Sequence, residues 1–246
     1  MDRLPLDVWR RLLDRSPNDA DFTLFGPLCA PPGAADGCFV LGRLAQSLDG
    51  FIAMPNGESH WIGGSEDIRH THRIRALSDA VIVGAGTVRA DNPQLTTRHV
   101  EGPSPVRVVL DPDRRLEIGY RVFAGGPETL LVCAPDAPSG DRFGEAEVVR
   151  APRGPSGLNI GAIVDLLALR GLRRLFVEGG GVTVSRFLTA GALDRMHVTV
   201  APLLMGAGIP AFPVPPVAAL AQSRRFGWTV HKLGDDVLLD IPLHRP

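Results

Sequence analysis

Apolar residues occur along this chain in two spacings, and the two spacings alternate. Short apolar runs that end in glycine or a polar residue are typical of buried strands, and they occupy residues 38–47, 79–86, 106–111, 129–134, 146–151, 173–181 and 194–206. Helical signals fill three of the intervals between them, 65–78, 158–171 and 182–191. A last stretch, 226–242, is expected to form a hairpin that turns at Gly234–Asp235. The alternation predicts an α/β fold with a largely parallel sheet, which the antiparallel hairpin makes mixed.

The first 36 residues follow a different pattern. Residues 5–15 have apolar positions at helical spacing, and the sequence Ser-Pro-Asn-Asp then ends them. The stretch from there to Gly37 is rich in proline, glycine and alanine, which is typical of a linker. We therefore expect an N-terminal extension and linker over residues 1–36 and one folded domain over residues 37–246.

Composition narrows the class of protein. A net charge of −1 argues against a nucleic-acid partner and against a polybasic membrane surface. The chain has no apolar run of the roughly 18 residues that a membrane span needs, and its N-terminus lacks the apolar core of a signal peptide. Cys29, Cys38 and Cys133 form no CxxC pair. These features predict a cytoplasmic protein.

A shortage of two residue types limits the available chemistry. Lys232 is the only lysine and Tyr120 the only tyrosine, which excludes a P-loop and a tyrosine–lysine dehydrogenase pair. Anions must then be bound by arginine, by backbone N–H groups or by helix N-termini. No metal site is expected, because the histidines are scattered and His70 and His72, two apart on a helix, point to different faces.

Two predicted strands end in glycine-rich turns that lead into helices, VIVGAGTVRADNP (81–93) and LFVEGGGVTVSRF (175–187). Glycine lets backbone N–H groups approach an anion at the positive end of a helix. The same sequences also suit a simple tight turn. The first departs from the GxGxxG dinucleotide pattern, which requires glycine where Arg89 stands.

Four segments in order carry a more specific signal: SLDGFIAMPNGESHWIGG (47–64), RIRALSDA (73–80), VGAGTVRADNPQLTTR (83–98) and VEGGGVTVSRFLTAGALD (177–194). Together they resemble the pyrimidine reductases of riboflavin biosynthesis (the RibD C-terminal domain), and the likeness runs from about Gly42 to Gly206. The resemblance implies a dihydrofolate-reductase-like fold: a mixed, mostly parallel sheet flanked by helices, with the antiparallel hairpin at its C-terminal end. It also implies that residues 37–246 are a reductase domain, with NADPH as cofactor, in a homodimer.

The resemblance further implies which residues form the site. Substrate contacts are expected from Ser59, Arg75, Leu95, Arg98 and Glu178. Cofactor contacts are expected from Ala45, Trp61, Thr87, Asp91, Gly180, Gly181, Val182 and Thr183, in a turn that continues to Arg186. Arg114 and Arg115, in the loop after Asp111, are expected to bind the 2′-phosphate of NADPH. Asp49 and Glu178 are the catalytic candidates: Glu178 could accept hydrogen bonds from pyrimidine N–H groups or ribose hydroxyls, and Asp49, like Asp91, is a candidate for positioning or proton supply.

Simpler interpretations stay open for several of these residues. Trp61 also suits a core position, Asp49 a cap of its own turn, Arg75 a solvated helix surface, and 112–115 a solvated turn. Relatives often carry lysine where Arg43 stands, and lysine or arginine where Phe51 stands. A guanidinium is not a proton donor at neutral pH, so Arg43 can only bind or orient.

The expected reaction is hydride transfer from NADPH to C1′ of a ring-opened ribosylamine, which converts a ribosylamino side chain into a ribitylamino one. The H-x-E and PCxxC signature of the zinc deaminases joined to some relatives is missing, so we expect no deamination. One alternative is a reductase of the same fold that acts on a pterin, a folate or another heterocycle. Another is a non-catalytic nucleotide-binding paralogue, against which Glu178, Thr87 and Asp91 argue.

Overall fold

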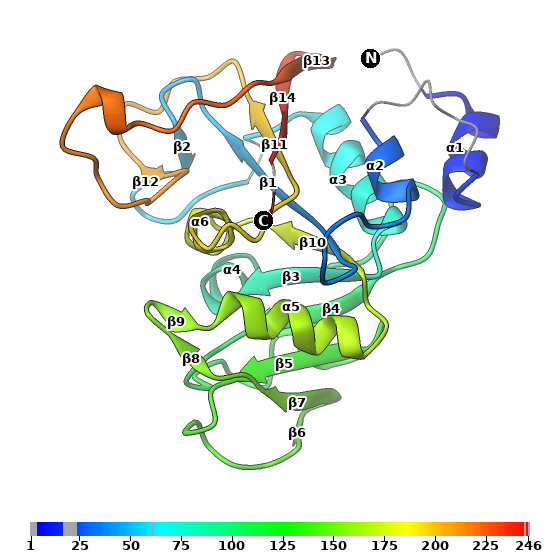
Figure 1. Ribbon diagram of the computed structural model, residues 1–246, viewed down its shortest axis with the longest axis vertical. Helices are drawn as coiled ribbons and strands as arrows, with labels where there is room; N and C mark the ends of the chain where they lie inside the picture. The colour runs from blue at the N-terminus through cyan, green and yellow to red at the C-terminus, as the bar shows by residue number, and fades with distance from the viewer. Residues whose placement is uncertain (1–3, 17–23, 61, 244, 246) are drawn as a thin grey trace.

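The computed structural model describes residues 4–16, 24–60, 62–243 and 245. A ten-stranded sheet runs through the molecule (Figure 1). In spatial order its strands are β13 (Thr229–Leu233), β14 (Asp236–Pro242), β11 (Arg195–Val200), β1 (Phe39–Gln46), β10 (Arg174–Glu178), β3 (Ala80–Gly84), β4 (Val106–Leu110), β5 (Thr129–Cys133), β7 (Ala146–Arg150) and β6 (Arg142–Phe143).

The directions of the strands confirm the predicted mixed, mostly parallel sheet. All neighbours from β11 through β1, β10, β3, β4 and β5 to β7 are parallel. The C-terminal hairpin β13–β14 adds to β11 in antiparallel register and turns at Gly234–Asp235. The long strand predicted over 194–206 ends early, at Val200, because Pro202 follows and has no N–H to donate to a ladder.

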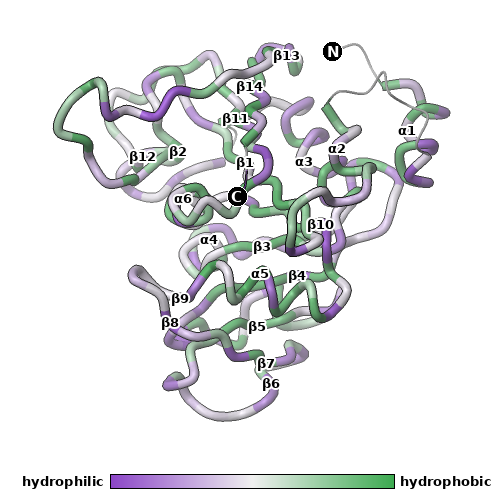
Figure 2. The backbone as a smooth tube through the Cα atoms, viewed as in Figure 1, coloured by the Kyte–Doolittle hydropathy of each residue, from purple (hydrophilic) through white to green (hydrophobic). Residues whose placement is uncertain are grey.

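Helices cover both faces of the sheet. Side chains alternate between the faces along each strand, so each central strand contributes to two cores. Val40 and Leu44 of β1 pack into the core shared with α5 (Ile160–Leu169) and α6 (Gly181–Thr189). Leu41 packs into the opposite core, shared with α3 (Ser65–Leu77) and α4 (Ala85–Asp91). Figure 2 shows hydrophobic colour along the central strands, as expected for strands buried on both faces.

The described part of the N-terminal segment joins the second of these cores. Trp9 and Leu12 of α1 (Leu6–Leu13) and Leu28 of α2 (Gly26–Cys29) are buried with the residues of α3. The division of the chain near residue 36 stays a prediction, although the described residues before it share this core.

Three smaller features border the sheet. β2 (Phe51–Ala53) pairs with β12 (Ile209–Pro210), and β8 (Arg153–Gly154) pairs with β9 (Gly157–Leu158). Short 3-10 turns occur at Arg121–Phe123 and Leu220–Gln222. Among the described residues, no helix is long and apolar enough to cross a lipid bilayer.

Candidate active site

A cavity of about 990 Å³ opens where the parallel strands β1, β10 and β3 end, between α3, α4 and α6. Open α/β sheets bind ligands at the carboxyl ends of their strands. The volume lies at the upper end of the range of about 300–1,000 Å³ for small-molecule pockets, so there is space for more than one small ligand.

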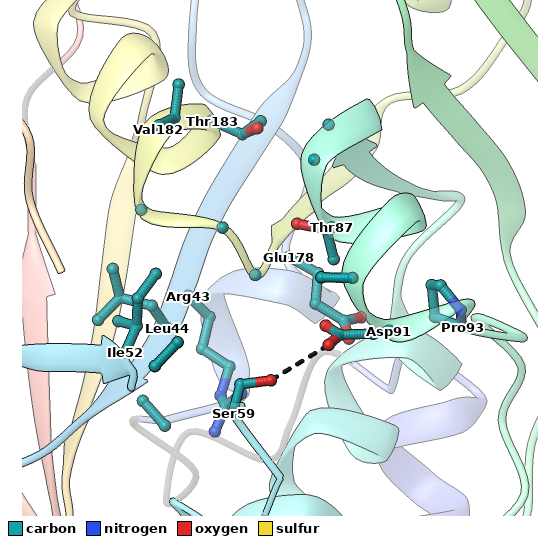
Figure 3. Close-up of a pocket in the computed structure, with 18 of the residues that line it drawn as sticks. Arg43, Leu44, Ile52, Ser59, Thr87, Asp91, Pro93, Glu178, Val182 and Thr183 are labelled. Atoms are coloured by element: carbon teal, nitrogen blue, oxygen red, sulfur yellow. Dashed lines mark hydrogen bonds between the residues drawn. The ribbon is translucent and has the colours of Figure 1, made fainter. Parts of the chain in front are cut away.

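One wall of the cavity is made of backbone. β10 and β3 are parallel neighbours, so the turns that follow them, Glu178–Gly181 and Gly84–Thr87, come together at the N-termini of α6 and α4. A Cβ added to Gly180 would lie 2.7 Å from Thr87 Oγ1, and one added to Gly84 would lie 2.5 Å from Thr183 Oγ1. The two glycine-rich turns predicted separately therefore form one surface, lined by Thr87, Val182 and Thr183 (Figure 3).

Gly180 has a backbone conformation that this wall requires. Its φ is +37°, in the region that side chains disfavour, and Gly179 before it has φ +68°. Without Cβ atoms here, the N–H groups at the start of α6 can approach a ligand directly. This geometry favours an anion-binding role over a simple tight turn.

The facing wall is charged, and its central feature is a buried ion pair. Arg75 of α3 donates from Nε and Nη2 to the two oxygens of Glu178, at 2.7 and 2.5 Å, and from Nη1 to the carbonyl of Thr96 at 2.9 Å. The side chain of Arg75 is only 7% exposed, so it is not a solvated helix residue. Each oxygen of Glu178 keeps a second lone pair for a ligand N–H or O–H.

A second buried pair lies beside the first. Arg43 of β1 is the register partner of Glu178 on β10 and forms an ion pair with Asp67 of α3. Asp67 also accepts a hydrogen bond from Thr199 Oγ1 at 2.6 Å. Arg43 Nε has no hydrogen-bond partner within the described part of the chain, and Arg43 lines the cavity. From the sequence, Arg43 was marked only as a position where relatives often carry lysine.

Three further arginines line the cavity, and none of their guanidinium groups forms a hydrogen bond or ion pair with the described residues: Arg98, Arg121 and Arg186. Partial burial and the nearby cations Arg75 and Arg121 lower the pKa of Arg98. Arg98 thus lies in a region of positive charge that a ligand anion would neutralise. Arg186, on α6, lies near Gly157 and therefore on the other side of the sheet from α3. Sequence reasoning did not select Arg121, which no motif marks.

Most of the other predicted site residues reach the cavity. Ala45 lines it, and so does Leu95, which is buried with φ +56°. Ser59 Oγ donates to Asp91 Oδ1 at 3.1 Å across the cavity mouth (Figure 3). Trp61 lies outside the described residues.

Asp49, one of the two catalytic candidates, is not brought to the cavity. Its carboxylate accepts hydrogen bonds from Ser47 Oγ at 2.6 Å and from the backbone N–H groups of Gly206 at 2.7 Å and Met205 at 3.1 Å. The bond from Ser47 is the main reason why the pKa of Asp49 is lowered. Asp49 thus stabilises its own turn and joins it to the loop after β11, which corrects the expectation of a place in the active site.

The expected position of Arg114 and Arg115 at the cofactor site is also corrected. Arg114 donates to the carbonyls of Pro138, Ser139 and Arg142 at 3.0, 2.5 and 2.9 Å, and Arg115 is exposed beside Asp113. Neither side chain lines the cavity, although Pro112 of the same loop does. The loop reaches the cavity at Pro112, and the contacts of Arg114 and Arg115 lie elsewhere.

The histidines of α3 make structural contacts. His70 Nε2 lies 3.1 Å from His197 Nδ1 in full burial, whereas His72 Nδ1 accepts the backbone N–H of Arg98 at 3.1 Å. The two rings thus point to different partners, as predicted. Burial lowers the pKa of both His70 and His197, and it lowers that of His72 to about 3. No group of three potential ligands suits a metal ion among the described residues.

Comparison with known proteins gives consistent matches. Residues 39–232 match the RibD C-terminal domain family. The chain is 37% identical over 175 residues to the 2,5-diamino-6-ribosylamino-4(3H)-pyrimidinone 5′-phosphate reductase of Methanothermobacter thermautotrophicus (68% of this chain, 79% of the relative). It is 33% identical over 180 residues to the protein of that name from Archaeoglobus fulgidus (68% and 82%).

Solved structures agree with these matches. The Thermotoga maritima diaminohydroxyphosphoribosylaminopyrimidine deaminase/5-amino-6-(5-phosphoribosylamino)uracil reductase superposes with a TM-score of 0.71 at 30% identity, over 84% of this chain and 57% of that one. RibD of Acinetobacter baumannii gives a TM-score of 0.74 at 28% identity, over 85% and 59%. This chain therefore spans somewhat more than half the length of these two structures.

Proposed function

The chain belongs to the RibD C-terminal domain family, and from that premise we propose that it reduces a ribosylamino-pyrimidine 5′-phosphate to the ribitylamino product with NADPH. The observation that carries the proposal is the cavity itself. It combines a backbone wall suited to a dinucleotide with a charged wall suited to a phosphorylated, hydrogen-bonding substrate. The chain is a reductase of riboflavin biosynthesis, so a nicotinamide cofactor is expected.

The residues present fit that cofactor. Gly180 to Thr183 would hold the pyrophosphate through backbone N–H groups at the start of α6, where Gly180 leaves space that a Cβ would fill. We assign the 2′-phosphate of NADPH to Arg186, because Arg114 and Arg115 face away and Arg186 has a free guanidinium at the cavity. When bound, NADPH supplies the hydride.

Arg186 can be tested separately from the rest of the site. Arg186→Ala should weaken binding of NADPH about tenfold to a hundredfold and leave NADH unchanged, since a hydrogen-bonded charge pair contributes roughly 1.5–3 kcal/mol. The matched control is the Arg114→Ala/Arg115→Ala double variant, which should leave both dissociation constants unchanged in a fluorescence titration. If the control variant instead loses affinity for NADPH but not for NADH, the 2′-phosphate binds at the loop of Arg114 and Arg115 and not at Arg186.

The charged wall would hold the substrate. Arg98 and Arg121 are free to bind the 5′-phosphate, whereas the donors of Arg75 are already bonded to Glu178 and Thr96. Arg75 therefore orients Glu178, and Glu178 accepts hydrogen bonds from pyrimidine N–H groups or ribose hydroxyls. Ser59 and Leu95 border the same space.

The chemistry needs one proton relocation and one proton uptake. Ring opening moves a proton from the glycosylamine nitrogen to the ring oxygen and leaves a C1′=N imine. C1′ then receives the hydride, and the nitrogen takes up a proton. Asp91, hydrogen-bonded to Ser59, is a cavity carboxylate outside the two buried ion pairs, and we assign it to holding the proton that these steps move.

We also propose a homodimer and a cytoplasmic location. Large apolar side chains are exposed between β11 and the edge strand β13 and on β13 itself: Leu204 (73%), Leu220 (78%), Trp228 (57%) and Val230 (57%). Exposed apolar side chains that gather into one patch mark an association surface, and we propose that these do. The three cysteines are free thiols, which suits a reducing compartment. Light scattering at micromolar concentration should give twice the mass of the chain; a monomer would contradict the dimer.

A substrate panel tests the function. NADPH oxidation should occur with the ribosylamino-pyrimidine 5′-phosphate and be much slower with the dephosphorylated compound or with dihydrofolate. Oxidation with a pterin or folate alone would favour the same-fold alternative. Cofactor binding with no turnover of any of these compounds would favour a non-catalytic paralogue.

A further inference from the structure

Helix α1 is attached to the loop that joins α4 to β4, residues 92–105. Trp9 Nε1 donates to the carbonyl of Glu101 at 2.9 Å, and Arg10 Nε lies 3.3 Å from Glu101 Oε2. At Gly102, whose φ is +138°, an added Cβ would lie 3.0 Å from Leu13 Cδ2 and 2.8 Å from Ala76 Cβ. The loop at this point is thus held between α1 and α3, with no space for a side chain.

The same loop carries cavity residues. Between Asp91 and Val106 it contains neither helix nor strand, yet it presents Leu95 and Arg98 to the cavity. On the inner side, α3 holds it through the bond from Arg75 to the Thr96 carbonyl and the bond from the Arg98 N–H to His72. The anchor to Trp9 at Glu101 is three residues beyond Arg98.

α1 also touches the helix that forms the charged wall. The guanidinium of Arg73, on α3, lies 6.0 Å from the centre of the Trp9 ring. Arg73 is a direct neighbour in sequence of His72, which lines the cavity. Trp9 is therefore in contact both with the loop that carries Arg98 and with α3, which holds that loop.

We propose that α1 is a positioning element for the substrate: through Trp9 it fixes the loop that carries Arg98, and so sets the affinity for the phosphate. The inference rests on the proposed function for the identity of the ligand, but its structural part does not. Residues 6–13 precede the region that matches the family, residues 39–232, so this support is additional to the matched domain. A charge-assisted hydrogen bond depends on distance and angle, so a displaced Arg98 would bind the phosphate less tightly.

Trp9→Phe is the sharpest test, because it keeps an aromatic ring in the core while it removes the Nε1–H donor and the smaller part of the indole. Hydrogen exchange at residues 96–104 should accelerate about fivefold, the change expected when one hydrogen bond is lost, while exchange in β1 stays the same. The KM for the phosphorylated substrate should rise by about the same factor, with kcat, the dissociation constant of NADPH and the KM for the dephosphorylated analogue unchanged. Leu6→Ala is the matched control on α1, because Leu6 is 54% exposed.

Trp9→Ala should enlarge both effects, and Trp9→His, which restores a ring N–H, should partly reverse them. Unchanged exchange at 96–104 in Trp9→Phe would overturn the positioning role, whether or not the protein reduces a pyrimidine. Faster exchange with equal KM changes for both substrate forms would limit α1 to general stability and also overturn the proposal. If the wild-type protein oxidises no NADPH while the loop still loosens in Trp9→Phe, the proposed function fails and the loop contact stands.

Discussion

The two walls of the cavity are built on opposite principles. The wall at Gly84–Thr87 and Gly179–Thr183 is made of backbone that side chains would obstruct, whereas the wall on α3, on β1 and at Glu178 is made of charged side chains that need partners. Adding atoms should therefore damage the first wall, and removing atoms should damage the second. The two walls also differ in how far they can be predicted from sequence. A glycine turn is a local pattern, whereas the partners Arg75 and Glu178 are 103 positions apart.

The largest effect should come from removing a charge from the second wall. Glu178→Ala leaves Arg75 buried without its partner, which costs about 3–5 kcal/mol of the free energy of unfolding, and it should abolish turnover. Urea unfolding measures the loss. The Arg75→Met/Glu178→Met double variant should recover most of the stability and none of the activity. Equal stabilities of the single and double variants would show that the pair carries no such penalty.

Loss of a free charge should affect binding rather than folding. Arg98→Ala should weaken binding of the phosphorylated substrate about tenfold to a hundredfold, from the roughly 1.5–3 kcal/mol of a charge-assisted hydrogen bond, and leave its dephosphorylated analogue unaffected. Arg121→Ala is the parallel variant, and Arg89→Ala, on the exposed face of α4, is the control. Isothermal titration with both ligands decides the matter: equal losses for both would remove Arg98 from the phosphate site.

In the backbone wall, an added side chain should be the damaging change. Gly180→Val places atoms against Thr87 Oγ1 and requires valine at φ +37°, so the dissociation constant of NADPH should rise about tenfold or more. Gly161→Ala on α5, where the new Cβ makes only an ordinary contact at 3.5 Å, is the control. Fluorescence titration that shows unchanged NADPH binding by a folded Gly180→Val protein would exclude this turn from the cofactor site.

The smallest effect concerns pH. The pKa of His72 falls from 6.5 to about 3 on folding, mainly by burial. A base with a lowered pKa in the folded state contributes stability that is complete above its unfolded pKa and is lost as pH falls below it. Between pH 7.5 and 6.0 the wild-type protein should lose about 0.8 kcal/mol more than His72→Gln. Parallel stability curves for the two proteins over this range would contradict a neutral, buried His72.

Local patterns predicted most of the fold and the backbone wall. Apolar runs predicted the strands, and Gly234–Asp235 predicted the hairpin. Glycine after a buried strand predicted the turn at Gly180. Side-chain direction was the part that could not be predicted. Arg114 and Asp49 stand in suitable loops but bond to nearby carbonyl and N–H groups instead. Arg121 reaches the cavity without any motif to mark it, and Arg186, at the end of the expected cofactor turn, reaches the cavity with an unpaired guanidinium that the motif did not indicate.

The central claim is that hydride passes from NADPH to C1′ of the substrate. It is tested most directly with NADPH deuterated at C4 of the nicotinamide, in two separate reactions with the two C4 epimers. The account predicts that one epimer, and not the other, yields a ribityl product one mass unit heavier, with the deuterium at C1′ by NMR. A product without deuterium from both epimers, or deuterium at any other carbon, would contradict it.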